Sequence, residues 1–157
     1  MLSLDDWLAG FDASEYHEVA TSRLPERASA AALAMPVAPN RLVRTLLRLR
    51  GLGRRGTIEQ AIERLGFAVL ERTATGAALS ASGKPWRPSG GLAGFEDRRP
   101  GAVRIAFVLA AGSGRLWTET RVTAVDGAAR PAFLRDRRPV GPCSAPIRRR
   151  WLRAAAR

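Results

Sequence analysis

The chain has 157 residues, 46% of them hydrophobic, and a single cysteine, which together exclude a disordered chain and a disulfide-stapled one and predict one domain. The formal net charge of +12 is carried by arginine, because Lys84 is the only lysine among 26 cationic residues. This bias is typical of a GC-rich genome, so the charge alone does not predict a nucleic-acid-binding protein.

Residues 1–13 form an acidic lead, in which Trp7, Leu8 and Phe11 are spaced like one or two helical turns that dock on the body. A loosely ordered terminus is the alternative. The lead carries acid where a signal peptide needs lysine or arginine, and no apolar run approaches the roughly 20 residues that span a bilayer. With Cys143 as a lone thiol, we expect a cytoplasmic protein without a membrane span.

A strand and three helices are predicted next. Residues 14–23 alternate as a strand does, and Pro25 suits the first position of a helix that ends at Met35. After Pro39, leucines at helical spacing predict a second helix: Leu42, Leu46 and Leu49. Thr57 and Gln60 then form a capping box for a short helix through Leu65.

Four further segments have the composition of strands: 67–73, 77–82, 102–110 and 115–123. Gly76 and Gly112-Ser-Gly114 mark the turns of two hairpins. A Pro/Gly loop over 83–91 contains Trp86. If Phe107 points inward, its strand alternation places Ile105 on the same face, and in the next strand Thr118 and Thr120 share one face.

The C-terminal segment is rich in arginine and proline. Asp126 is a good helix cap, but four prolines follow it: Pro131, Pro139, Pro142 and Pro146. Because a proline inside a helix costs about 3 kcal/mol or more, we expect two or three helical pieces. In the last piece an apolar residue recurs every fourth position: Cys143, Ile147 and Trp151.

These elements predict an α+β domain over residues 14–157, in which a C-terminal helix lies across one curved antiparallel sheet.

The sequence offers few candidate catalytic or binding residues. His17 is interpreted as an ordinary strand residue and Cys143 as a buried apolar one, with a base and a nucleophile as their alternatives. Glu119 and Arg121 share a strand face, where they pair at the surface or anchor a ligand. No spacing predicts a metal site, and we expect no cofactor.

The element order and three stretches resemble the START-like helix-grip superfamily (SRPBCC), which includes polyketide cyclase/dehydrase-type proteins. The stretches are Ser82-Gly-Lys-Pro-Trp-Arg-Pro88, Trp117-Thr-Glu-Thr-Arg-Val122 and Val140-Gly-Pro-Cys-Ser-Ala-Pro-Ile-Arg-Arg-Arg-Trp-Leu152. The resemblance is to the uncharacterised, actinobacterial-type members. It implies a mostly apolar cavity between sheet and helix, which relatives use for lipids, sterols, polyketides or aromatic metabolites. The matched stretches carry no catalytic motif.

The first functional prediction is therefore a binding protein for a small lipophilic or aromatic metabolite. Its expected contacts are two aromatic walls, one aliphatic neighbour and two hydroxyls: Trp86, Phe107, Ile105, Thr118 and Thr120. One alternative is a basic protein that binds nucleic acid or an acidic partner, since residues 130–157 hold nine arginines and one acid, although we expect only weak, non-specific nucleic-acid binding. A cyclase-type pocket enzyme is the other alternative.

Overall fold

The computed structural model describes residues 2–38, 41, 44–45, 55–86, 91–94, 96 and 98–157, without the side chains of residues 139–143. Its elements in chain order are α1 (Asp5–Leu8), β1 (Ala13–Ala20), α2 (Pro25–Ala34), α4 (Ile58–Arg64), β2 (Ala68–Thr73), β3 (Gly76–Gly83), β4 (Val103–Gly112), β5 (Arg115–Ala124) and α5 (Ala129–Ala155). The helix expected at Leu42, Leu46 and Leu49 lies outside the described residues, as does the side chain of Cys143.

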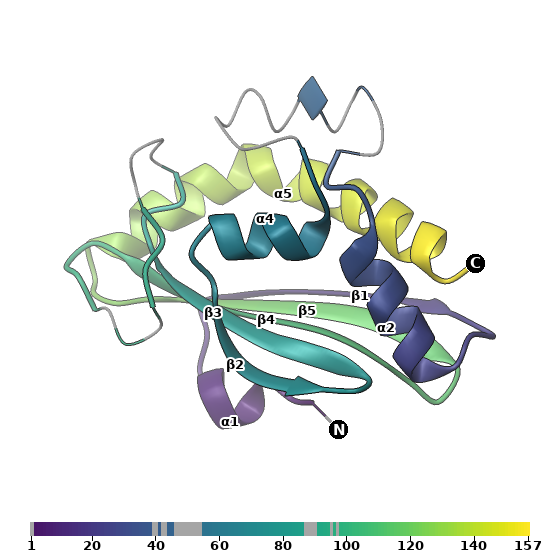
Figure 1. Cartoon of the computed structure of the whole chain (residues 1–157). Coiled ribbons are helices and arrows are strands. Elements are labelled where there is room, and N and C mark those ends of the chain that lie inside the picture. The colour runs from purple at the N-terminus through teal and green to yellow at the C-terminus, as the bar shows by residue number, and fades with distance from the viewer. Residues whose placement is uncertain are drawn as a thin grey trace.

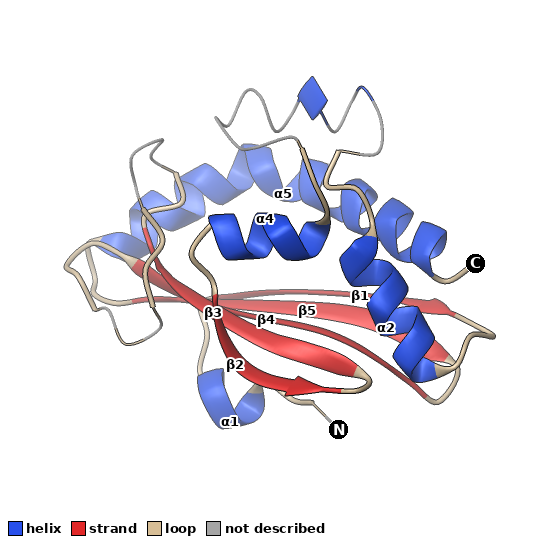
Figure 2. Cartoon of the chain, in the orientation of Figure 1, coloured by secondary structure: helices blue, strands red, loops and turns tan. Residues whose placement is uncertain are grey.

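One five-stranded antiparallel sheet organises the fold, with the strand order β1-β5-β4-β3-β2. The sheet is curved and open, so β1 and β2 are its edges. Figures 1 and 2 show α2, α4 and α5 on one side of the sheet, called the inner face here, and α1 on the other, the outer face. The predicted α+β class with a C-terminal helix across an antiparallel sheet is confirmed.

Local sequence explains several of these elements. Ser113 and Gly114 both have positive φ, 49° and 72°, as the two central residues of a tight β4–β5 hairpin require. At the start of α4, the Thr57 hydroxyl accepts a hydrogen bond from the Gln60 amide while the Gln60 side chain accepts one from the Thr57 amide. The predicted capping box is therefore confirmed.

The inner face shows the alternation that the strands predict. Phe107 of β4 lies opposite Thr120 of β5, and Leu109 lies opposite Thr118. Leu109 packs in the same buried cluster as Trp151 of α5, which places this set of side chains under the helix. A shift of one residue would move all of them to the opposite face, so burial fixes the register.

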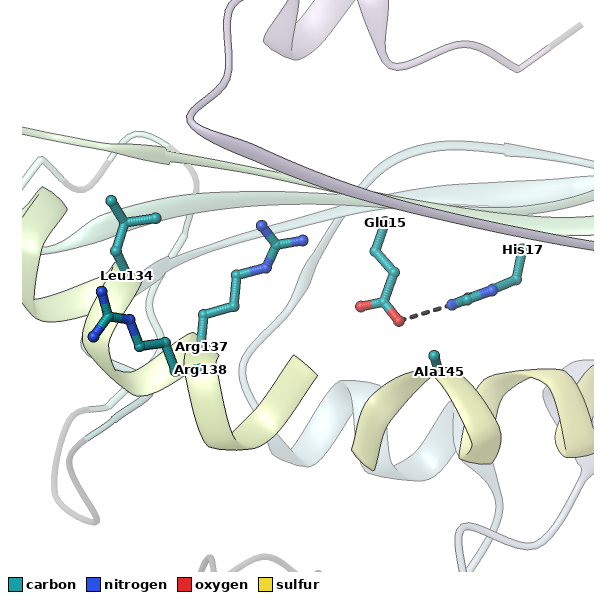
Figure 3. A pocket seen from close by; sticks show the side chains of 6 residues that line it. All are labelled: Glu15, His17, Leu134, Arg137, Arg138 and Ala145. Carbon is teal, nitrogen blue, oxygen red and sulfur yellow. Dashed lines mark hydrogen bonds and ion pairs between the residues drawn. The ribbon is translucent and has the colours of Figure 1, made fainter. Parts of the chain in front are cut away.

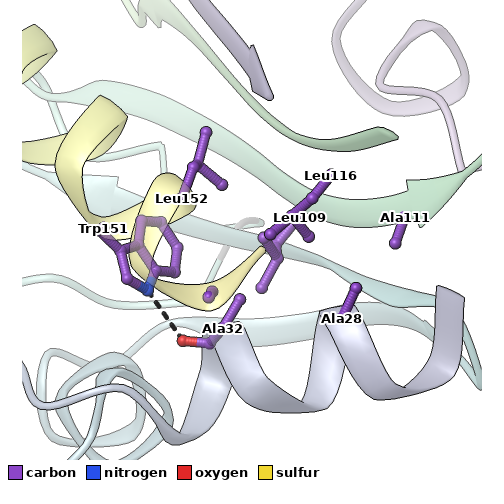
Figure 4. Packing of buried hydrophobic residues seen from close by; sticks show 8 residues of the cluster. Ala28, Ala32, Leu109, Ala111, Leu116, Trp151 and Leu152 are labelled. Carbon is purple, nitrogen blue, oxygen red and sulfur yellow. Dashed lines mark hydrogen bonds between the residues drawn. The ribbon is translucent and has the colours of Figure 1, made fainter. Parts of the chain in front are cut away.

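Two apolar clusters join α5 to the inner face, one near each end of the helix. The C-terminal cluster combines α2, α5 and the strands, and Figure 4 shows Trp151 and Leu152 packed over Leu109 and Leu116. The Trp151 indole donates from Nε1 to the carbonyl oxygen of Ala32 at 2.9 Å, so its polar end is satisfied as well. The N-terminal cluster contains Ala13, Val103, Ala129 and Phe133, with Trp86 and Ile105 against it.

The expectation that α5 is broken into pieces is wrong. The helix runs for 27 residues, from Ala129 to Ala155. Pro131 lies in the first turn, where its missing N–H has no helical partner to lose. The later prolines remain inside the helix because the two clusters hold both of its ends on the sheet, so tertiary packing outweighs the local cost.

The N-terminal residues cover the outer face. Leu2, Leu4 and Leu8 are buried against β3 and β4, while Trp7 and Phe11 stay 36% and 45% exposed. The lead docks as expected, but through its leucines rather than its aromatic residues.

Arg121 joins this lead to the sheet. Its Nη1 donates to Asp5 Oδ1 at 2.6 Å and to the Leu8 carbonyl at 3.1 Å, and its Nε donates to Glu119 Oε1 at 2.6 Å. The guanidinium also lies 4.9 Å from the centre of the Phe11 ring. The predicted Glu119–Arg121 pair forms, but Arg121 is only 9% exposed, because the docked lead covers it; it is not a surface pair.

Candidate binding groove between β1 and α5

A polar patch lies on the inner face between the two apolar clusters. It consists of Glu15 and His17 of β1 and their cross-strand partners in β5, since Glu15 lies opposite Thr120 and His17 lies opposite Thr118. All four alternate onto the face that α5 covers. The centre of α5 therefore lies over polar groups, whereas its ends lie over apolar ones.

A groove of about 530 Å³ opens between this patch and α5. Its described lining residues are Glu15, His17, Leu134, Arg137, Arg138 and Ala145. Figure 3 shows Arg137 and Ala145 on the helix side, and Glu15 and His17 hanging from β1 above them. Because β1 is an edge strand, the groove is open to solvent along that side.

Glu15 and His17 form a hydrogen-bonded pair in the groove. His17 Nε2 lies 2.7 Å from Glu15 Oε1, and the side chains are 7% and 22% exposed. The other carboxylate oxygen of Glu15 accepts a hydrogen bond from the Ser144 hydroxyl of α5 at 3.3 Å. Because an ionised carboxylate only accepts hydrogen bonds, Nε2 is the donor in this pair.

Arg148 lies beside this pair, one helical turn after Ser144. Its Nη1 donates to the Thr120 hydroxyl at 2.6 Å, and its Cζ lies 5.5 Å from the centre of the Phe107 ring. Burial lowers the pKa of Arg148, and the negative charge of Glu15 opposes that shift. The guanidinium is held among aromatic and hydroxyl groups, and it forms no carboxylate ion pair within the described residues.

The Thr118 hydroxyl is fully buried and has no hydrogen-bond partner in the part of the chain that the structure describes. An unsatisfied buried hydroxyl costs about 1–3 kcal/mol. The hydroxyls of Ser80 and Ser82 in β3 are also buried without a hydrogen-bond partner among the described residues, but these side chains point to the outer face. The Thr118 hydroxyl can therefore still donate and accept a hydrogen bond on the inner face.

The structure places the five predicted ligand contacts at different depths. Thr118 and Thr120 adjoin the groove as cross-strand partners of His17 and Glu15. Phe107 lies one strand further in, under Arg148. Ile105 and Trp86 lie together at the N-terminal cluster. None of the five is among the described residues that line the groove itself.

The sequence did not single out Glu15 and Arg137 of the groove, or Arg148 beside it. For Glu15 a signal exists, because alternation from Val19 places residues 17 and 15 on the buried face. For the arginines the signal was misleading, since arginine on a helix usually lies in solvent.

The described residues contain neither a candidate membrane span nor a candidate metal site. No helix among them is long and apolar enough to cross a membrane. No cluster of three or more histidine, cysteine, aspartate or glutamate side chains there could hold a metal ion. The chain matches no protein-family model, no curated protein and no solved structure.

Proposed function

We propose that this protein binds a small lipophilic or aromatic metabolite between α5 and the inner face, with the groove beside β1 as the entrance. The observation that carries the proposal is the groove itself. Its volume of about 530 Å³ falls within the range of roughly 300–1,000 Å³ that small-molecule sites occupy. It combines apolar walls, Leu134 and Ala145, with a few convergent polar groups, which is the usual composition of such sites.

Membership of the START-like helix-grip superfamily is part of the same proposal. It is supported by the helix that crosses a curved antiparallel sheet and by the three stretches named above. In that family the ligand lies under the C-terminal helix. Phe107, Thr118 and Thr120 are then the contacts for the part of the ligand that reaches furthest in.

Blocking the groove tests this function. Ala145→Phe places a ring in the groove, whereas Ala154→Phe adds the same ring to an exposed position of the same helix. Compounds from a metabolite panel should raise the Tm of the wild type and of Ala154→Phe but not of Ala145→Phe. A ligand at 100 times its Kd adds about 2.7 kcal/mol to stability, which a thermal melt resolves readily.

The proposal fails if no compound of a broad panel raises Tm, or if Ala145→Phe responds as the wild type does. Phe107→Ala gives a second readout, because it enlarges the space next to Thr120 and should change which compounds raise Tm. Native mass spectrometry of protein purified from its host would identify a molecule that copurifies.

The exposed side of α5 favours a second candidate, the binding of nucleic acid or another acidic partner. The exposed arginines of α5 are Arg130, Arg135, Arg138, Arg149, Arg150 and Arg153, and Arg157 is exposed just after the helix ends. Arginine attraction to phosphate predicts weak binding without sequence preference, and such binding falls steeply with salt. A labelled duplex titrated at two salt concentrations tests it; binding that survives high salt and distinguishes sequences would make this the leading function.

A further inference from the structure

Two partly buried arginines of α5, Arg137 and Arg148, lie near Glu15. Arg137 lines the groove and donates from Nη2 to the Ser14 carbonyl at 3.0 Å. Arg148 donates to Thr120 and lies against Phe107. Within the described residues, neither forms an ion pair with a carboxylate.

Glu15 does not neutralise both cations. Its two oxygens already accept hydrogen bonds from His17 and Ser144, so its charge is directed toward those partners. Arg138 adds a further cation at the mouth of the groove. The described part of the groove therefore has more positive charge than negative charge. Cations that are partly removed from water without a counter-ion are costly, and an anion that enters the groove would offset that cost.

We propose that the ligand is an organic acid whose carboxylate lies against Arg137 in the groove, with Arg148 as the second positive charge further in. This inference rests on the proposed small-molecule site and names the chemistry of its ligand. The apolar body of the acid lies along Leu134 and Ala145 toward Phe107. A group with one negative charge fits better than a phosphate, because the carboxylate of Glu15 repels a second charge.

Matched pairs of probes separate charge from shape. Naphthalene-2-carboxylate is compared with naphthalene-2-carboxamide, and decanoate with decanamide, by isothermal titration of the full chain. The variant is Arg137→Met, which keeps most of the stem but removes the charge. The control is Arg149→Met, which removes an exposed cation from the same helix.

We expect each acid to bind the wild type at least about tenfold more tightly than its amide, which corresponds to about 1.4 kcal/mol. In Arg137→Met this preference should fall to less than about threefold, because a carboxylate loses a charged partner and its amide loses at most a neutral hydrogen bond. Arg149→Met should retain the full preference. If Arg137→Met does not fold, Arg148→Gln gives the same comparison.

Each other outcome has a distinct meaning. If amides bind as tightly as acids, the carboxylate assignment is wrong and the small-molecule site stands. If no member of either pair binds at millimolar concentration, the proposed function itself fails. If the preference for acid over amide fell equally in Arg137→Met and Arg149→Met, it would come from the overall charge of α5, and the specific site would be wrong. Inorganic phosphate that binds more tightly than either acid would overturn the assignment to an organic acid.

Discussion

Arg121 and Arg148 are two sheltered arginines on opposite faces of one sheet, and their surroundings differ. Burial by itself would lower the pKa of both guanidinium groups. At Arg121, hydrogen bonds to Asp5 and Glu119 outweigh burial and raise the pKa, whereas at Arg148 the more distant Glu15 does not, so its pKa stays lowered. The outer-face cation is therefore paired with carboxylates of the chain, whereas the inner-face cation has no carboxylate ion pair among the described residues.

This difference separates a structural contact from a candidate site. On the outer face every strong partner of Arg121 is supplied by the chain, and together they hold the lead against the sheet. On the inner face Arg148, Arg137 and the Thr118 hydroxyl keep polar capacity that the described residues do not use. Evolution tolerates such a cost most readily where a ligand recovers it.

Removing the outer-face contact should have the largest effect on stability. Arg121→Met leaves Glu119 and the Leu8 carbonyl without their donor and removes the polar contact between α1 and the sheet. We expect a loss of about 3 kcal/mol in the free energy of unfolding, measured by urea denaturation. Arg115→Met is the control, because its ion pair with Glu18 is exposed, at 61% and 39%, and its loss should change stability much less. Equal losses in the two variants would contradict the contrast between buried and exposed arginines.

Replacing prolines of α5 tests whether the helix is continuous. Because α5 begins at Ala129, Pro146 is an interior residue and Pro131 belongs to the first turn. Pro146→Ala should restore a helical hydrogen bond and raise the free energy of unfolding by about 1–2 kcal/mol, after the greater freedom of the unfolded chain is subtracted. Pro131→Ala should be near neutral or slightly unfavourable. Unchanged thermal and urea midpoints in Pro146→Ala would mean that the helix begins near residue 145.

The fold was predictable to a large extent because its signals are local. Alternation and turn glycines gave both hairpins, and Thr57 with Gln60 gave the start of α4. The continuity of α5 was not predictable, because the cost of its prolines is local while the packing that outweighs it comes from distant strands. The groove was not predictable either, because it forms between residues that are distant in the sequence: Glu15 and Ser144 are hydrogen-bonded although they are 129 residues apart. Composition alone does not show which arginine of a helix is sheltered.

The beginning of α5 should respond to acid. Asp126 accepts hydrogen bonds from the amides of Gly101, Ala129 and Ala128, and these lower its pKa from the ordinary 3.8. A carboxylate with a lowered folded pKa stabilises the fold above its unfolded pKa, and this stabilisation is lost as the pH falls through the folded value. Asp126→Asn should lower Tm by a few degrees at pH 7. The difference from the wild type should shrink below pH 3.8, and melts at both pH values check it. A difference that does not change with pH would show that the charge plays no part.

The smallest effect on stability is expected for Arg148→Met, the inner-face counterpart of Arg121→Met. The substitution removes the hydrogen bond to Thr120 and the contact of the guanidinium with Phe107, both of which are stabilising. It also removes a partly buried charge that has no carboxylate ion pair in the part of the chain that the structure describes, and methionine fills much of the same space against the ring. These terms oppose each other, so the free energy of unfolding without ligand should change by less than about 1 kcal/mol. Urea denaturation beside Arg121→Met measures both arginines under the same conditions. A loss as large as that of Arg121→Met would show that Arg148 is as structural as its outer-face counterpart, and that the inner face has no polar capacity reserved for a ligand.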